Sequence, residues 1–80
     1  MYQYYITEVR ETASGEFEHE NFWAFDEVKK KAELKGEAKY HEVMARAAVS
    51  TYAHHSAILF SSDAVPIMFG SYDHTEGATE

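Results

Sequence analysis

DEVKKKAELKGEAKYHEVMARAAVS, residues 26–50, is the stretch of sequence that decides the fold. Small and apolar residues recur in it every three or four positions, the spacing of one face of an α-helix, at Val28, Ala32, Gly36, Tyr40, Val43 and Ala47. Asp26 is a good N-cap residue. The pattern predicts one long helix from about Asp26 to Ser50, kinked or closely packed at Gly36. The alternative is two helices, because glycine commonly follows a helix end.

Two strands are predicted before this helix. Residues 2–10 are rich in tyrosine and β-branched residues, a composition typical of strands. Residues 12–15 form a turn in which Gly15 can adopt a positive φ. From Glu16 to Asn21, acidic residues alternate with other residues, which indicates a half-buried second strand paired with the first as a hairpin.

Two more strands are predicted after the helix. Residues 55–60 are the most apolar of the strand segments, so we expect them in the centre of the sheet. A turn at 61–64 leads to a last strand at 67–72. The sequence therefore predicts an α+β fold of order ββαββ, in which the helix packs on one face of a four-stranded antiparallel sheet. We expect one domain over residues 1–73 and a flexible acidic tail over 74–80. The predicted structural residues are Gly36, Tyr40, Val43, Ala47 and Ile58.

Composition argues against several classes of protein. The 80 residues contain no cysteine, which excludes disulfides and thiolate metal sites. No apolar run approaches the roughly 20 residues of a membrane-spanning helix, and we expect no secretory signal at the N-terminus. The net charge is −7. A chain this acidic is repelled by nucleic acid unless its lysines gather on one face, and Glu33 and Glu37 interleave with the lysines of residues 29–39.

No motif for catalysis, a cofactor or a metal is present. The five histidines lack the i, i+4 spacing of a helical zinc site, and they are His19, His41, His54, His55 and His74. The serines lack a nucleophile elbow, and the four glycines form no phosphate-binding loop. We therefore expect neither an enzyme nor a metal or cofactor protein.

The face of the sheet that the helix leaves open is the candidate interaction surface. One helix covers only one side of a four-stranded sheet, and the predicted strands carry apolar or tyrosine residues on both sides. Tyrosine and methionine are common at protein interfaces. The predicted partner-binding residues are Tyr2, Tyr4, Glu16, Glu18, Glu20, Trp23 and His41. The alternative is a structural protein whose two copies pair through the helix-free face.

Four segments of the chain form a distinctive combination: Ala38-Lys39-Tyr40-His41, Ala47-Ala48-Val49-Ser50, His55-Ser56-Ala57-Ile58-Leu59 and Tyr72-Asp73-His74. In this combination they resemble a group of small uncharacterised proteins of Firmicutes phages and integrative elements. The resemblance covers about half of the chain, and it implies a genomic context in which short acidic proteins bind and block host proteins. Together with the small size, the negative charge and the lack of catalytic motifs, this context leads us to expect a non-catalytic, cytoplasmic inhibitor of a bacterial host defence complex, such as a CRISPR nuclease. The alternative is a homodimeric structural or virion-associated protein.

Overall fold

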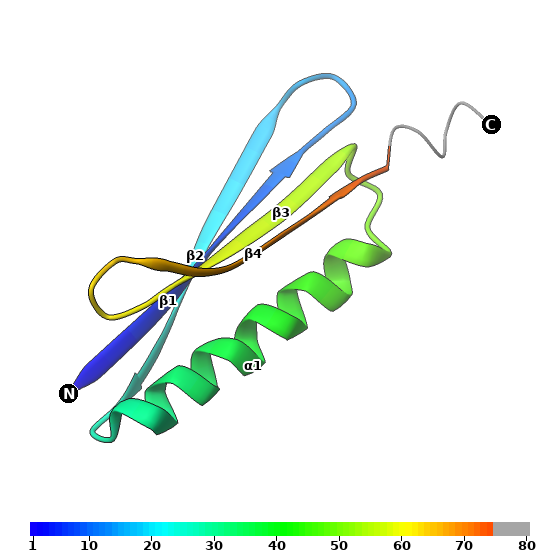
Figure 1. Cartoon of the computed structure of the whole chain (residues 1–80). Helices are drawn as coiled ribbons and strands as arrows, with labels where there is room; N and C mark the ends of the chain where they lie inside the picture. The colour runs from blue at the N-terminus through cyan, green and yellow to red at the C-terminus, as the bar shows by residue number, and fades with distance from the viewer. Residues whose placement is uncertain (75–80) are drawn as a thin grey trace.

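The structure, a computed structural model, describes residues 1–74 and has the predicted ββαββ order. The elements are β1 (Tyr2–Glu11), β2 (Phe17–Asp26), α1 (Lys29–Ala48), β3 (His54–Phe60) and β4 (Pro66–Asp73). The strands form one antiparallel sheet in the order β2-β1-β3-β4, with α1 along one face (Figure 1). The predicted fold is confirmed, and β3 lies in the centre of the sheet, as its apolar sequence indicates.

The β1–β2 hairpin is longer than the sequence predicts. Gly15 has a φ of 91°, so the turn uses the conformational freedom expected of it. The second strand continues through the apolar residues 22–25 to Asp26, and all of β2 pairs with β1. In this apolar run Phe22 is half-buried and Trp23 is exposed. Successive side chains therefore point to opposite sides of the sheet.

Asp26 does not cap the helix as predicted. The helix begins at Lys29, and Asp26 is the last residue of β2. Its carboxylate accepts hydrogen bonds from the Lys35 ammonium (2.8 Å) and from the Val28 backbone N–H (2.9 Å). Together these bonds hold the pKa of Asp26 below its ordinary value. Asp26 therefore joins the end of β2 to the second turn of α1.

Gly36 lies within a single continuous helix, so the alternative of two helices is wrong. A Cβ at Gly36 would lie 3.0 Å from Tyr4 Cβ and 3.1 Å from Leu59 Cδ1. The glycine therefore lets α1 approach β1 and β3 closely, as its position on the apolar face predicts. The buried residues of α1 are Ala32, Gly36, Tyr40, Val43 and Ala47.

The core lies between α1 and alternate residues of the sheet. Its largest fully buried apolar members are Tyr4, Ile6, Val43 and Leu59, and Tyr40 packs with them. Ile58, which the sequence predicts as a structural residue, lies half-buried on the side opposite the helix, because its neighbours Ala57 and Leu59 face the helix. Tyr40 reaches β4, where a Cβ at Gly70 would lie 2.6 Å from its hydroxyl oxygen.

The predicted tail begins too early. The His74 backbone N–H donates to the Ala53 carbonyl (2.8 Å), and its Nε2 lies 2.8 Å from the Ala47 carbonyl oxygen. His74 therefore joins β4 to the last turn of α1. Residues 75–80, the rest of the predicted tail, lie outside the described residues.

Replacing Tyr40 by alanine is expected to destabilise the fold strongly. Deleting a buried aromatic side chain typically costs about 3–5 kcal/mol, and Tyr40 is buried against the sheet. His41→Ala is the matched control, because His41 is exposed next to it and should change the free energy of unfolding by less than about 1 kcal/mol. Urea unfolding measures both, and a Tyr40→Ala protein as stable as the parent would contradict this packing.

Candidate binding surface

The register of the sheet divides the strand residues into two faces. Residues that are paired across strands point to the same side of a sheet, so Tyr5 shares its side with Trp23 on β2 and Phe60 on β3. Tyr4, its chain neighbour, points to the helix and is only 1% exposed. Within residues 1–74, no element covers the side on which Tyr5 lies (Figure 1).

The helix-free side carries a continuous group of large apolar residues, here called the aromatic face. It consists of Tyr5, Trp23, Phe25, Ile58, Phe60, Ile67 and Phe69. Trp23 is 53% exposed and Phe69 is 66% exposed. A group of large apolar side chains exposed to this extent on adjacent strands is typical of an interaction surface.

Ring stacking holds the centre of the aromatic face in place. The Tyr5 ring stacks on Phe60 with centroids 4.6 Å apart, and it lies 5.0 Å from the tilted ring of Trp23. Trp23 in turn lies 6.4 Å from Phe25. These rings come from three adjacent strands, so they form a row across the sheet. Each ring limits the rotamers of the next ring in the row. The rings therefore lose less conformational entropy when a partner binds to them.

Formal charge is confined to one end of this side of the sheet. The acidic residues whose side chains share the side of the aromatic face are Glu11 and Asp73, which flank His54. His54 lies 3.9 Å from the Glu11 carboxylate and 3.6 Å from that of Asp73. The aromatic face is therefore separated from charge, although the whole chain carries a net charge of −7.

The predicted partner-binding residues do not form one surface. Trp23 lies in the aromatic face, but Tyr4 is buried under α1, so its assignment to a partner surface is wrong. The reason is that α1 covers the even-numbered residues of β1, whose side Tyr2 and Tyr4 share. Tyr2 is exposed at the start of β1, and His41 is exposed on α1 with its ring edge-on to Tyr40.

The three predicted glutamates lie in and beside the β1–β2 hairpin. Glu16 is exposed in the turn, and Glu18 and Glu20 extend from the helix side of β2, where Arg10 binds both of them. The Arg10 distances are 3.5 Å to Glu18 and 2.9 Å to Glu20. Burial lowers the pKa of Arg10, but the hydrogen bond to Glu20 and the charge of Glu8 outweigh it and raise that pKa above its ordinary value.

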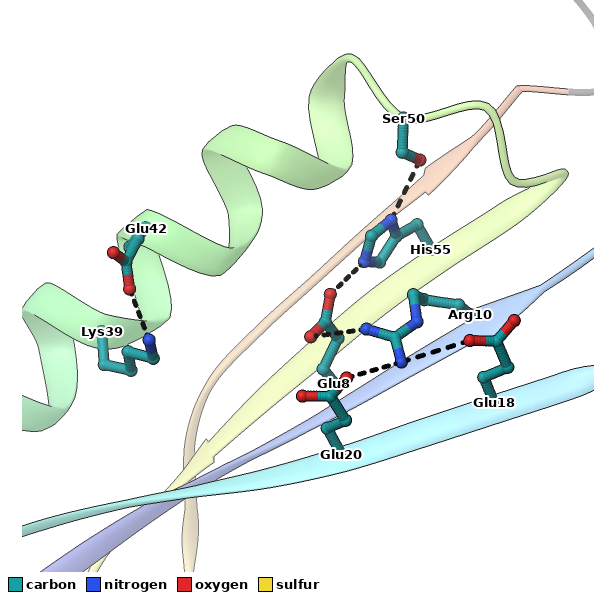
Figure 2. A network of polar contacts seen from close by, with 8 residues as sticks. All are labelled: Glu8, Arg10, Glu18, Glu20, Lys39, Glu42, Ser50 and His55. Atoms are coloured by element: carbon teal, nitrogen blue, oxygen red, sulfur yellow. Dashed lines mark hydrogen bonds and ion pairs between the residues drawn. The ribbon is translucent and has the colours of Figure 1, made fainter.

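A buried polar cluster that was not predicted from the sequence lies under the last turn of α1 (Figure 2). Glu8 is 1% exposed and His55 is 3% exposed, and His55 Nε2 donates a hydrogen bond to the Glu8 carboxylate. His55 Nδ1 lies 2.9 Å from the Ser50 hydroxyl. The other Glu8 oxygen forms an ion pair with Arg10 at 3.2 Å. Alternation of Ile6, Glu8 and Arg10 along β1 is the signal that places Glu8 on the buried side.

The chain Ser50–His55–Glu8 has the residue types of a hydrolase triad, but not its geometry. In such triads Nε2 faces the hydroxyl and Nδ1 faces the carboxylate, whereas here the two nitrogens are reversed. The imidazole is also almost fully buried, which keeps a substrate from reaching it. The arrangement supports a structural role, in which the cluster fastens the end of α1 to β1 and β3.

Comparison of the chain with protein-family models, with curated proteins and with solved structures found no match in any of the three. Within residues 1–74, no three histidine or carboxylate side chains are placed to hold a metal ion. None of the helices in the described part of the chain is long and apolar enough to cross a membrane.

Replacing His55 by leucine is expected to lower the free energy of unfolding by about 3–5 kcal/mol, because the buried Glu8 carboxylate would lose one of its two partners, His55 and Arg10. His54→Leu is the matched control, since the adjacent histidine is half exposed and should change stability by only about 0.5 kcal/mol. If His55→Leu leaves no folded protein, Ser50→Ala is expected to cost about 1 kcal/mol. Equal effects of the two histidine variants in urea unfolding would refute the structural role of the cluster.

Proposed function

We propose that this chain is a non-catalytic protein-binding module that binds its partner through the aromatic face. The observation that carries this proposal is a row of packed rings in which Trp23 is exposed and Tyr5 and Phe60 are half-buried, on a sheet face that nothing else in residues 1–74 covers. Tryptophan and tyrosine in apolar surroundings contribute most to the affinity of protein interfaces. The buried polar cluster, in contrast, is inaccessible and serves the fold.

The charge of the chain supports one class of partner in particular. An apolar centre on a chain with a net charge of −7 fits a partner whose apolar patch lies beside a basic surface, and nucleic-acid enzymes carry basic surfaces. The resemblance to small proteins of Firmicutes phages and integrative elements favours the same class. We therefore propose that the partner is a host defence complex, such as a CRISPR nuclease, that the chain inhibits in the cytoplasm of a bacterial host.

A second candidate is a homodimeric structural or virion-associated protein whose two copies pair through the aromatic face. The absence of formal charge from the aromatic face favours it, because two copies would bury no charges there.

Removing the exposed rings tests the proposal. Trp23→Ser combined with Phe69→Ser is expected to weaken capture of the partner from a Firmicutes lysate at least about 100-fold, since single interface aromatics can each contribute about 2 kcal/mol or more. Leu34→Ser is the matched control, because Leu34 is 51% exposed on α1, away from the sheet. Circular dichroism checks that all variants are folded.

Capture that survives the double substitution would refute the aromatic face as the binding surface. Salt separates the two candidates. A basic partner is expected to dissociate as salt is added, whereas pairing of two uncharged faces should persist. Recovery of no nucleic-acid enzyme at low salt would exclude the defence-complex proposal.

A further inference from the structure

The backbone of β2 has one side that no strand covers. In an antiparallel pair, hydrogen-bonded and non-hydrogen-bonded residue pairs alternate. The Thr12 N–H donates to the Glu16 carbonyl (2.9 Å), one position beyond the last ladder pair, Glu11 with Phe17. The even-numbered residues of β2 therefore bond to β1, and the odd-numbered ones point their N–H and C=O groups outward. This outward set, the β2 edge, comprises Phe17, His19, Asn21, Trp23 and Phe25.

The two outer strands of the sheet are protected to different degrees. Natural proteins protect open edges with proline, bulges or charge. The strand β4 begins at Pro66, and its pairing with β3 is irregular between Leu59 and Phe60. The strand β2 has ten residues, no proline and a regular register, and its three acids are paired within the chain, Glu18 and Glu20 with Arg10 and Asp26 with Lys35. The β2 edge is thus the better template for another strand.

Charge is arranged along β2 in two halves. Glu16, Glu18 and Glu20 lie in or beside its first half. Its second half borders a groove lined by residues 21–25 together with Lys35 and Lys39 of α1. Lys39 Nζ lies 4.4 Å from the centre of the Phe22 ring, and Lys35 Nζ lies 3.2 Å from the Phe25 carbonyl oxygen. In an antiparallel pair, the first half of an added strand lies opposite the second half of β2. Acidic residues in the first half of that strand would therefore lie beside Lys35 and Lys39.

We propose that the occupant is a second copy of this chain, with β2 pairing antiparallel to β2 around a two-fold axis at Asn21. Asn21 then lies opposite itself, His19 opposite Trp23 and Phe17 opposite Phe25, all through outward backbone groups. On the helix side, Glu20 of one copy lies opposite Phe22 of the other, beside Lys39. Glu18 lies opposite Ala24, at the same groove.

Neighbouring registers are worse electrostatically. An axis at Glu20 sets that carboxylate opposite its own copy, and an axis at Phe22 sets Glu18 opposite Asp26. Like charges that lie directly opposite each other destabilise strand pairs. With the axis at Asn21, the acidic pair is Glu16 with Asp26, at the outermost position, where Lys35 binds Asp26. The charge pattern of β2 therefore selects one register.

The paired sheets would form one eight-stranded sheet with both aromatic faces on the same side. This dimer leaves the aromatic face open, so it is compatible with the proposed partner binding and doubles the number of binding surfaces. It differs from pairing of the aromatic faces, which would bury Trp23 between the two copies.

A disulfide test is sharp because the chain has no cysteine. Hydrogen-bonded antiparallel pairs have Cα atoms about 5.5 Å apart, which lies within the disulfide range. Asn21→Cys is therefore expected to form a covalent dimer on mild oxidation at micromolar concentration. Ser71→Cys is the matched control, because Ser71 is exposed on β4, the other outer strand. Equal crosslinking of the two variants, or none at position 21, would overturn the proposal.

Reversing the charge of a lysine gives a second test. It is made on chains without an introduced cysteine, and analytical ultracentrifugation measures the dissociation constant of the dimer. Lys39→Glu is expected to raise the dimer dissociation constant about tenfold. The substitution turns two symmetry-related attractions, each between Lys39 of one copy and Glu20 of the other, into repulsions. Lys29→Glu changes the net charge equally but lies outside the groove, so it should change that constant by less than about threefold. A wild-type chain that is monomeric at 100 µM or so, or equal effects of the two substitutions, would overturn the proposal. Loss of the dimer with retained partner capture would leave the proposed function standing.

Discussion

A single helix covers only one side of a four-stranded sheet, and the rest of this structure depends on that constraint. The chain uses α1 to bury the even-numbered residues of β1 and their neighbours, with Gly36 allowing contact with Tyr4 and Leu59. The odd-numbered residues of β1 then have no cover within residues 1–74. In a chain of this size, the covered side supplies the whole core, and the opposite side is free to carry function.

The covered side includes a carboxylate that is almost fully buried, and its desolvation is energetically unfavourable. Burying a charge is tolerated only with close partners, and Glu8 has two, His55 and Arg10. Arg10 is in turn bound by Glu18 and Glu20, so the cluster extends from the interior to the surface of β2 (Figure 2). Because Ser50 and His55 lie on either side of the α1–β3 connection, the cluster also fixes how the helix meets the sheet.

The fold could be predicted because two periodicities in the sequence are clear. The spacing from Ala32 to Ala47 gives the helix and its buried side, and it also placed Gly36 correctly. Alternation gave the strands, but it does not say which of their two sides the helix covers. Tyr4 was therefore assigned to a partner surface although α1 covers it, since both sides of β1 carry apolar residues.

The buried cluster and the aromatic face depend on pairing between strands that are distant in sequence. Glu8 meets His55 across 47 positions, and Tyr5 stacks on Phe60 because β1 pairs with β3. No local pattern carries that register. Asp26 shows the opposite case. It is a residue type that favours a helix N-cap, but it lies at the end of β2 and binds Lys35 instead.

Fluorescence of Trp23, the one tryptophan of the chain, tests the central claim that the aromatic face is open. The account predicts emission close to that of the unfolded chain and efficient quenching by acrylamide, because Trp23 is half exposed in the fold and stays open in a dimer paired through β2. This result should hold from nanomolar to micromolar concentration. Blue-shifted emission that acrylamide does not quench would contradict the account, because it would show that the aromatic face is covered in the isolated protein.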